Sequence, residues 1–129
     1  MSAERAVQAN LVSLQASRSD SGPLWSTESE DLDCTFVAWE AGHGVVEHVN
    51  SEVDVIMVVI SGYGMVYVNG EAIELTRGTV VVVPKEATRA IKATGDGLAY
   101  VNVHKRRKRL HLGKAADRTK GQIGLTARN

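Results

Sequence analysis

Residues 42–62, GHGVVEHVNSEVDVIMVVISG, join a spaced set of polar side chains to a long apolar run. Every second position from 48 to 54 is polar, and the four residues are His48, Asn50, Glu52 and Asp54. In a β-strand, side chains at positions i and i+2 point to the same side, so these groups can share one face of a sheet. We therefore expect the chemistry of this protein to be centred on this stretch.

Short apolar segments separated by turn signals continue along the chain on both sides of this stretch. The segments predicted as strands are 24–29, 34–40, 45–49, 53–60, 65–68, 72–75, 79–83, 89–93 and 98–103. Asn69-Gly70 is typical of a type I′ hairpin turn, and the glycine-rich segments 62–64 and 95–97 are expected to turn the chain. Such regularly spaced short strands indicate one all-β sandwich or barrel.

The composition is that of a globular protein with one core, in a chain of 129 residues whose formal net charge is zero. The charges are unevenly distributed, since residues 104–129 hold nine Lys and Arg against one Asp, and the preceding 103 residues carry a net charge of −8. A single cysteine, Cys34, excludes an internal disulfide. The N-terminus lacks the pattern of a secretory signal and the longest apolar run is too short to span a bilayer, so we expect a cytoplasmic protein without membrane contact.

Three parts are predicted: an N-terminal segment at 1–22, a β-barrel at 23–104 and a basic, flexible tail at 105–129. The N-terminal segment fits an edge strand, a short helix or a disordered chain. The tail fits a solvated arm, a segment that folds over an acidic partner subunit, or an arm that contacts nucleic-acid phosphates. Since the basic run lacks interleaved aromatic residues, the solvated arm is favoured over the nucleic-acid arm.

The quoted stretch resembles the first motif of the cupins, small barrels with a double-stranded jelly-roll fold, whose pattern is G-x5-H-x-H-x3–4-E-x6-G. The residues in register are Gly42, His48, Asn50 and Asp54, and the closing Gly62 comes one residue late. The second cupin motif, G-x5-P-x-G-x2-H-x3-N, matches at Gly78 and Pro84 but has Glu86, Arg89 and Ala93 at its last three positions. The resemblance covers residues 33–104 and implies a cupin-type jelly-roll barrel.

A divalent metal is the cofactor that the resemblance implies, because cupins commonly hold Fe, Mn, Zn or Ni with histidines and a carboxylate. The candidate ligands here are His48, Asn50 and Asp54, and Arg89 replaces the expected fourth ligand. A guanidinium has no free lone pair and repels a divalent cation. We therefore favour an ion pair between Arg89 and Asp54 in place of the metal, because a buried carboxylate requires a counter-charge.

Each candidate site residue has a functional and a structural interpretation. His48 is a candidate general acid/base, or a core histidine bonded to a neighbouring polar group. Arg89 is a candidate for binding the carboxylate or phosphate of a ligand. Asn50, Asp54 and Tyr67 are further ligand-binding candidates, whose structural alternatives are a turn, an ion pair and core packing, respectively.

These observations predict a small barrel protein that binds or transforms a small polar or anionic molecule in its interior. Two alternatives are open: a non-catalytic metabolite-binding, sensor or structural dimeric protein, and a metal-dependent enzyme of the oxygenase or lyase type. A homodimer is expected because the sheet edges of a small barrel must be covered, and the N-terminal segment is the element best placed to exchange between subunits.

Overall fold

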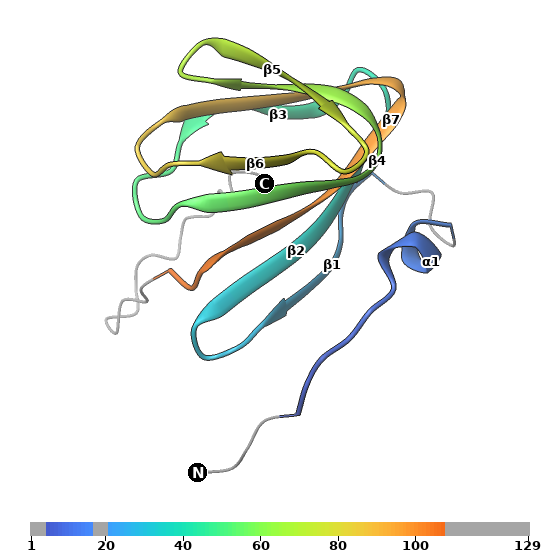
Figure 1. The fold of residues 1–129 in the computed structure, drawn as a ribbon, viewed down its shortest axis with the longest axis vertical. Helices are drawn as coiled ribbons and strands as arrows, with labels where there is room; N and C mark the ends of the chain where they lie inside the picture. The colour runs from blue at the N-terminus through green and yellow to red at the C-terminus, as the bar shows by residue number, and fades with distance from the viewer. Residues whose placement is uncertain (1–4, 17–20, 108–129) are drawn as a thin grey trace.

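The computed structural model describes residues 5–16 and 21–107, which form seven β-strands and one short helix (Figure 1). In chain order the elements are α1 (Leu11–Ala16), β1 (Gly22–Glu28), β2 (Leu32–Trp39), β3 (Gly44–Val49), β4 (Val55–Val68), β5 (Glu71–Thr76), β6 (Val80–Val83) and β7 (Thr88–Lys105). The predicted all-β fold is therefore confirmed. The six residues of α1 are the only helix in the described ranges, and they fall far short of the length that crosses a bilayer.

The strands form two facing layers that share the two longest strands, β4 and β7. The first half of β4 and the second half of β7 lie in a layer with β1, β2 and β6, and the other halves lie in a layer with β3 and β5. All of these pairs are antiparallel, and the continuous strand order is β1-β2-β7-β4-β5. Both long strands therefore connect one layer to the other, as Figure 1 shows.

The main hydrophobic core lies between the two layers. Alternate residues of each strand point inward, which explains why the burial pattern of β4 and β7 has a period of two along most of their length. The core residues are Val37, Val45, Met57, Val59, Val66, Leu75, Val81, Val83, Ala87, Ile91, Ala93, Leu98 and Tyr100. The interior of this barrel is thus mostly apolar, so each polar side chain that enters it stands out.

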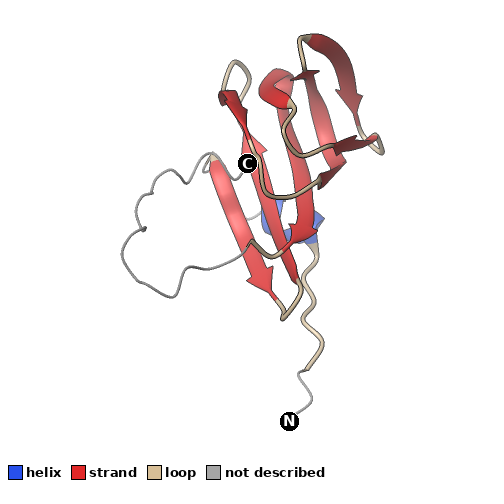
Figure 2. Ribbon diagram, turned by 90° about the vertical axis from the view of Figure 1, so that its left-hand side faces the viewer, coloured by secondary structure: helices blue, strands red, loops and turns tan. Residues whose placement is uncertain are grey.

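A second, smaller cluster lies on the outer face of the β1-β2-β7-β4 layer and is covered by α1. Leu11 and Leu14 of the helix pack against a group that consists of Leu24, Trp25, Phe36, Ala38, Ile60 and Ala99. The helix begins after Asn10, whose side-chain oxygen accepts a hydrogen bond from Ser13 N at 2.9 Å. Of the alternatives for the N-terminal segment, the structure shows the helix for residues 11–16, and Figure 2 shows it against the sheet.

The hairpin predicted at Asn69-Gly70 is confirmed. Both residues have positive φ, 51° and 83°, as a type I′ turn requires, and Val68 pairs with Glu71 across it. The turns predicted at 62–64 and 95–97 are wrong. At both segments the strand continues, and the β4–β7 register shifts between Val59 and Tyr63 as the pair bends from one layer into the other.

Glycine permits this bend because the two strands touch there. A Cβ on Gly62 would overlap the carbonyl oxygen of Gly97, and both glycines have positive φ. A bend and a turn place the same demands on local backbone conformation, so the composition of the two segments does not distinguish them.

Replacing Glu86 with glycine is expected to stabilise the fold by about 1 kcal/mol. Glu86 is exposed and has φ 76°, in the left-handed region, at the position where the second cupin motif has glycine. The left-handed conformation costs a residue with a Cβ about 1–2 kcal/mol. This cost is larger than the about 0.5–1 kcal/mol of extra conformational entropy that glycine loses on folding. Urea unfolding of Glu86→Gly and of the control Glu86→Ala measures the change in the free energy of unfolding. An equal change in both variants would contradict the explanation by backbone strain.

Candidate functional site

Polar side chains enter the apolar interior mainly from β7. Arg89 is 4% exposed, Asn102 is 1% exposed and His104 is 6% exposed. Tyr100, Asn102 and His104 alternate along the second half of β7 and so point to the same side as the core. Arg89 belongs to the first half of the same strand, in the facing layer. The bend in β7 therefore places Arg89 in the layer that faces the other three.

The guanidinium of Arg89 is the buried charge of this site. Strand pairing places the residue between His48 of β3 and Val68 of β4. Burial lowers its pKa, Tyr100 opposes that shift, and Arg107 lowers the pKa further because both groups are cationic. Since a guanidinium stays protonated, the charge is held in the interior at a cost. Its Nη1 atom has no hydrogen-bond partner within residues 5–16 and 21–107.

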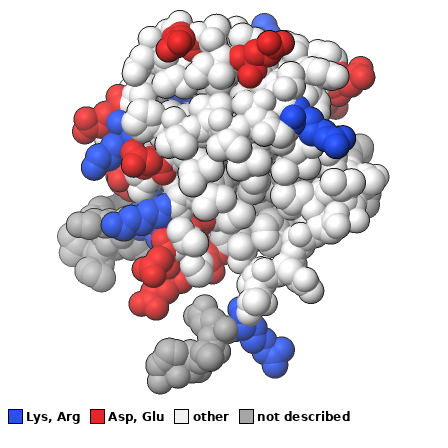
Figure 3. Space-filling view, in the orientation of Figure 1, with Lys and Arg blue, Asp and Glu red and all other residues white. Residues whose placement is uncertain are grey.

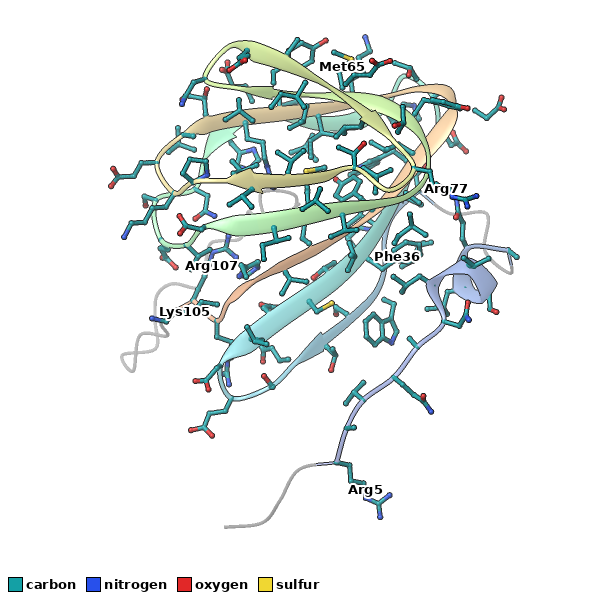
Figure 4. All side chains as sticks on the ribbon, viewed as in Figure 1. Arg5, Phe36, Met65, Arg77, Lys105 and Arg107 are labelled. Atoms are coloured by element: carbon teal, nitrogen blue, oxygen red, sulfur yellow. The ribbon has the colours of Figure 1, made fainter. Side chains whose placement is uncertain are left out.

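Arg107 places a second guanidinium at the rim of the barrel, beyond the end of β7 (Figure 4). Its Nε atom lies 3.7 Å from Glu52 Oε1, and its Nη1 atom lies 3.5 Å from His104 Nε2. His104 Nδ1 donates to the carbonyl oxygen of Lys105 at 2.8 Å, so Nε2 of the neutral ring is the acceptor for Arg107. A surface cavity of about 300 Å³ opens beside these groups, lined by Glu52, Val53, Lys105, Arg106 and Arg107.

Asn102 is a site residue that the sequence analysis did not single out. Neither its Oδ1 nor its Nδ2 atom has a hydrogen-bond partner in the described part of the chain. A buried amide with both atoms unsatisfied costs about 1–3 kcal/mol per group, so such a group is rare in a core. The alternation of polar Asn102 with apolar neighbours in a predicted strand was the available signal for this residue.

His48 lies beside Arg89 because the two residues are partners in the β3–β7 ladder. Its Nδ1 atom is 3.0 Å from the carbonyl oxygen of Val46, which can only accept, so Nδ1 carries the proton of the neutral ring. The lone pair is then on Nε2, which is buried. The predicted proximity of His48 and Arg89 is therefore found, and His48 has the tautomer that a base requires.

The structure does not bring Asn50 and Asp54 to this site. Strand β3 ends at Val49, so the residues that follow form a loop and the alternation expected from 48 to 54 does not hold. Asn50 Nδ2 donates to Val53 O and its Oδ1 accepts from Glu52 N, both at 3.0 Å, as in an Asx turn. Asp54 is exposed and accepts a hydrogen bond from Lys85 N at 2.8 Å.

Tyr67 also lies outside the interior, since it is 38% exposed and its neighbours Val66 and Val68 point inward. The expected ion pair between Arg89 and Asp54 was wrong, because Asp54 points to solvent while Arg89 is buried. The alternation rule failed here because it applies only within a strand.

The residues present do not fit the metal site that the cupin resemblance implies. In the ranges that the structure describes, no three His, Cys, Asp or Glu side chains are close enough together to hold a metal ion. Of the candidate ligands, His48 has its Nε2 atom buried, and the cation of Arg89 is its neighbour. Imidazole beside a fixed guanidinium is a poor donor set for a divalent cation.

The phenol of Tyr100 is buried near Trp39 and Arg89, and its pKa is raised to about 12. Burial is the main cause; the hydrogen bond from Trp39 Nε1, at 3.0 Å, and the charge of Arg89 act in the opposite direction. The folded protein therefore holds this proton more tightly than the unfolded chain, where the pKa is 10.0. The stabilisation is complete below the lower of these pKa values and is lost as the pH rises through the higher one.

We expect the Tyr100→Phe variant to be less sensitive to alkali than the wild type. Unfolding by urea at about pH 9 and about pH 11.5 measures the loss of stability, and the variant is expected to lose less because it lacks the phenol. The comparison cancels the ionisation of lysine, which both proteins share. An equal loss in both proteins would show that Tyr100 does not titrate in this way.

The first part of the basic segment lies against acidic residues of the barrel. Arg106 Nε is 3.8 Å from Glu28 Oε2, its Nη1 donates to Ser29 O at 3.2 Å, and its backbone N donates to Asp31 O at 2.8 Å. Figure 3 shows acidic and basic side chains next to one another at this side of the molecule. Residues 108–129 of the predicted tail lie outside the described ranges, so the alternatives for the tail stay predictions.

No family model and no curated protein sequence matches this chain. Several solved structures are similar to this chain. KdgF from Halomonas sp. is 22% identical, with a TM-score of 0.60 over 64% of this chain and 74% of that one. A cupin-2 domain containing protein from Shewanella frigidimarina is 19% identical, with a TM-score of 0.66 over 76% and 94%.

A third similar structure is the salicylate 1,2-dioxygenase from Pseudaminobacter salicylatoxidans, at 24% identity and a TM-score of 0.54. The match covers 57% of this chain and 21% of the dioxygenase. Neighbours at this level of identity establish the fold. The chain thus has the jelly-roll fold of the cupin proteins, as its two partial motifs predicted.

Proposed function

We propose that this protein binds a small anionic molecule inside its barrel, with Arg89 as the residue that holds the negative charge. The observation that carries the proposal is the buried guanidinium of Arg89, whose Nη1 atom has no partner among the described residues. A buried charge is retained at a cost, and a bound carboxylate or phosphate would offset that cost with a charge-assisted hydrogen bond.

The second guanidinium supports an anion rather than a neutral ligand. Arg107 acts on Arg89 as a like charge, and the carboxylate paired with Arg107 is Glu52 at the rim, which is half exposed. An anion placed between the two cations would attract both and offset their mutual repulsion. One of the similar structures, the salicylate 1,2-dioxygenase, is named for a small aromatic carboxylate, which is consistent with such a ligand.

Proton transfer on the same ligand is a second candidate function. It is favoured by the arrangement of His48, whose Nδ1–H is directed to Val46 O and whose basic Nε2 is buried beside Arg89. In this reaction Arg89 would hold the anionic group and His48 would accept a proton at Nε2 and later return it. The step needs no group from outside the chain.

The test of binding is a titration of the full-length protein with acetate, succinate and inorganic phosphate, followed by NMR of its histidine side chains. We expect at least one of the three to shift the signals of His48 or His104. The Arg89→Met variant is expected to bind that anion about 10- to 100-fold more weakly, because a hydrogen bond to a charged group contributes about 1.5–3 kcal/mol.

The matched control is Arg77→Met, the same substitution at an exposed arginine after β5 (Figure 4). Its affinity is expected to equal that of the wild type. The proposal would be overturned if none of the three anions bound, or if Arg89→Met and Arg77→Met bound the anion equally well.

A further inference from the structure

We infer that the ligand of the Arg89 site is a hydroxy acid, and that Asn102 is the residue that recognises its hydroxyl group. The inference rests on the proposed anion site at Arg89 and names the class of molecule that enters it. It depends on a different residue and on a different kind of hydrogen bond, so the two proposals can fail separately.

Asn102 has a central position in its layer of the barrel. Its cross-strand partners are Thr35 of β2 and Met57 of β4, so it stands in the middle of a layer, away from any sheet edge. Residues with even numbers from 98 to 104 in β7 are all buried, which means that Asn102 points inward with them. The amide therefore belongs to the inner wall of the barrel.

This wall faces the layer that carries Arg89. Tyr100, two residues before Asn102, belongs to the same buried core cluster as Ile91, which lies two residues after Arg89 on the buried face of β7, and Arg89 and Tyr100 each shift the pKa of the other. His104, two residues after Asn102, contacts Arg107, which also acts on Arg89. Because Asn102 lies between Tyr100 and His104 on one face, it faces the space in which an anion on Arg89 would sit.

The amide of Asn102 can form two kinds of hydrogen bond. Asn102 offers a donor, Nδ2, and an acceptor, Oδ1, and both lack a partner among the residues that the structure describes. A hydroxyl group can accept from the first and donate to the second. A ketone satisfies only the donor, an ammonium group satisfies only the acceptor, and a hydrocarbon satisfies neither. A hydroxy acid supplies both groups, a carboxylate for Arg89 and a hydroxyl for Asn102.

The experiment compares acids that differ by one hydroxyl group. Isothermal titration calorimetry of the full-length protein uses three pairs of increasing size: lactate with propionate, malate with succinate, and salicylate with benzoate. In the pair that fits the pocket, we expect the hydroxy acid to bind about tenfold or more tightly, because a site built to bond a hydroxyl rejects an analogue that lacks it.

The variant that tests the role of Asn102 is Asn102→Leu, which has a similar size and no polar atoms. It is expected to bind both members of the pair with the weaker affinity, and its thermal unfolding shows whether it is folded. Thr35→Val is the neighbouring control, since it removes a hydroxyl from the cross-strand partner of Asn102. This control is expected to keep the preference for the hydroxy acid.

The outcomes separate the two proposals. If both members of every pair bind equally well and Arg89→Met weakens them, the anion site stands and the hydroxy-acid inference is overturned. If Asn102→Leu is folded and keeps the preference, the assignment to Asn102 is overturned. If Asn102→Leu does not fold, equal binding of a pair by the wild-type protein still refutes the inference. Failure of all six acids to bind would overturn the hydroxy-acid inference, and the anion site would be overturned with it if acetate and inorganic phosphate also failed to bind.

Discussion

Replacing Arg89 with methionine is expected to raise the free energy of unfolding by about 1–4 kcal/mol, the range found when buried ion pairs are exchanged for well-packed apolar groups of similar volume. Arg89 is 4% exposed, and burial lowers its pKa because the interior disfavours the charge. Methionine is unbranched and flexible, so it can fill much of the space that the arginine occupies. The same variant is expected to lose anion binding, so stability and function change in opposite directions.

The direction of this change distinguishes a ligand site from a structural ion pair. If Arg89 were paired with a carboxylate in the free protein, removing it would leave that carboxylate unpaired and would destabilise the fold by about 3–5 kcal/mol. Urea unfolding followed by the fluorescence of Trp25 and Trp39 measures the change. Arg77→Met is the control and is expected to stay within about 0.5 kcal/mol of the wild type, as for most surface substitutions. A marked loss of stability in Arg89→Met would refute the interpretation as a ligand site.

Replacing Gly62 with alanine is expected to destabilise the protein by more than about 4 kcal/mol, which is an exceptional effect for one methyl group. Gly62 has φ 86°, and an added Cβ would overlap the backbone carbonyl of Gly97. Backbone atoms cannot move aside as a flexible side chain can, so β4 and β7 would have to separate at their bend. Since these two strands connect the layers, we expect the whole barrel to be affected.

Gly78 provides the matched control for this substitution. It has φ 90°, nearly the same backbone conformation, but an added Cβ would meet nothing within 4 Å. Gly78→Ala is therefore expected to lower the free energy of unfolding by only about 1–2 kcal/mol, because the left-handed conformation disfavours a residue with a Cβ by that amount. Thermal unfolding of the two variants compares them directly. Similar losses in both would show that the contact between the strands does not matter.

The fold was largely predictable because it depends on local patterns. Alternating apolar residues, Asn69-Gly70 and Pro84 each act within a few residues, and the all-β prediction followed from them. The bends of β4 and β7 were missed because a glycine-rich segment permits a bend and a turn equally. Which of the two forms depends on whether Gly62 meets Gly97, and those residues are far apart in the chain.

The candidate site was predictable only in part. His48 and Arg89 were found because they stand on motif positions of the cupin resemblance, and the structure places them side by side. Asn50 and Asp54 were misplaced because the strand that carries His48 ends at Val49. Tyr100, Asn102 and His104 had the spacing of an ordinary half-buried strand, and no local feature marks which face of that strand meets the buried arginine.

The sequence by itself determined the all-β class of the fold, the hairpin at Asn69-Gly70 and the absence of a histidine at the fourth cupin ligand position. Those properties reside in residue types and short spacings, which act before the chain is packed. Only the tertiary structure decided that Arg89 is buried with an unpartnered Nη1 atom among the described residues and that Asp54 faces solvent. The physical reason is that the cost of burying a charge depends on what surrounds it, and the bend in β7 sets those surroundings.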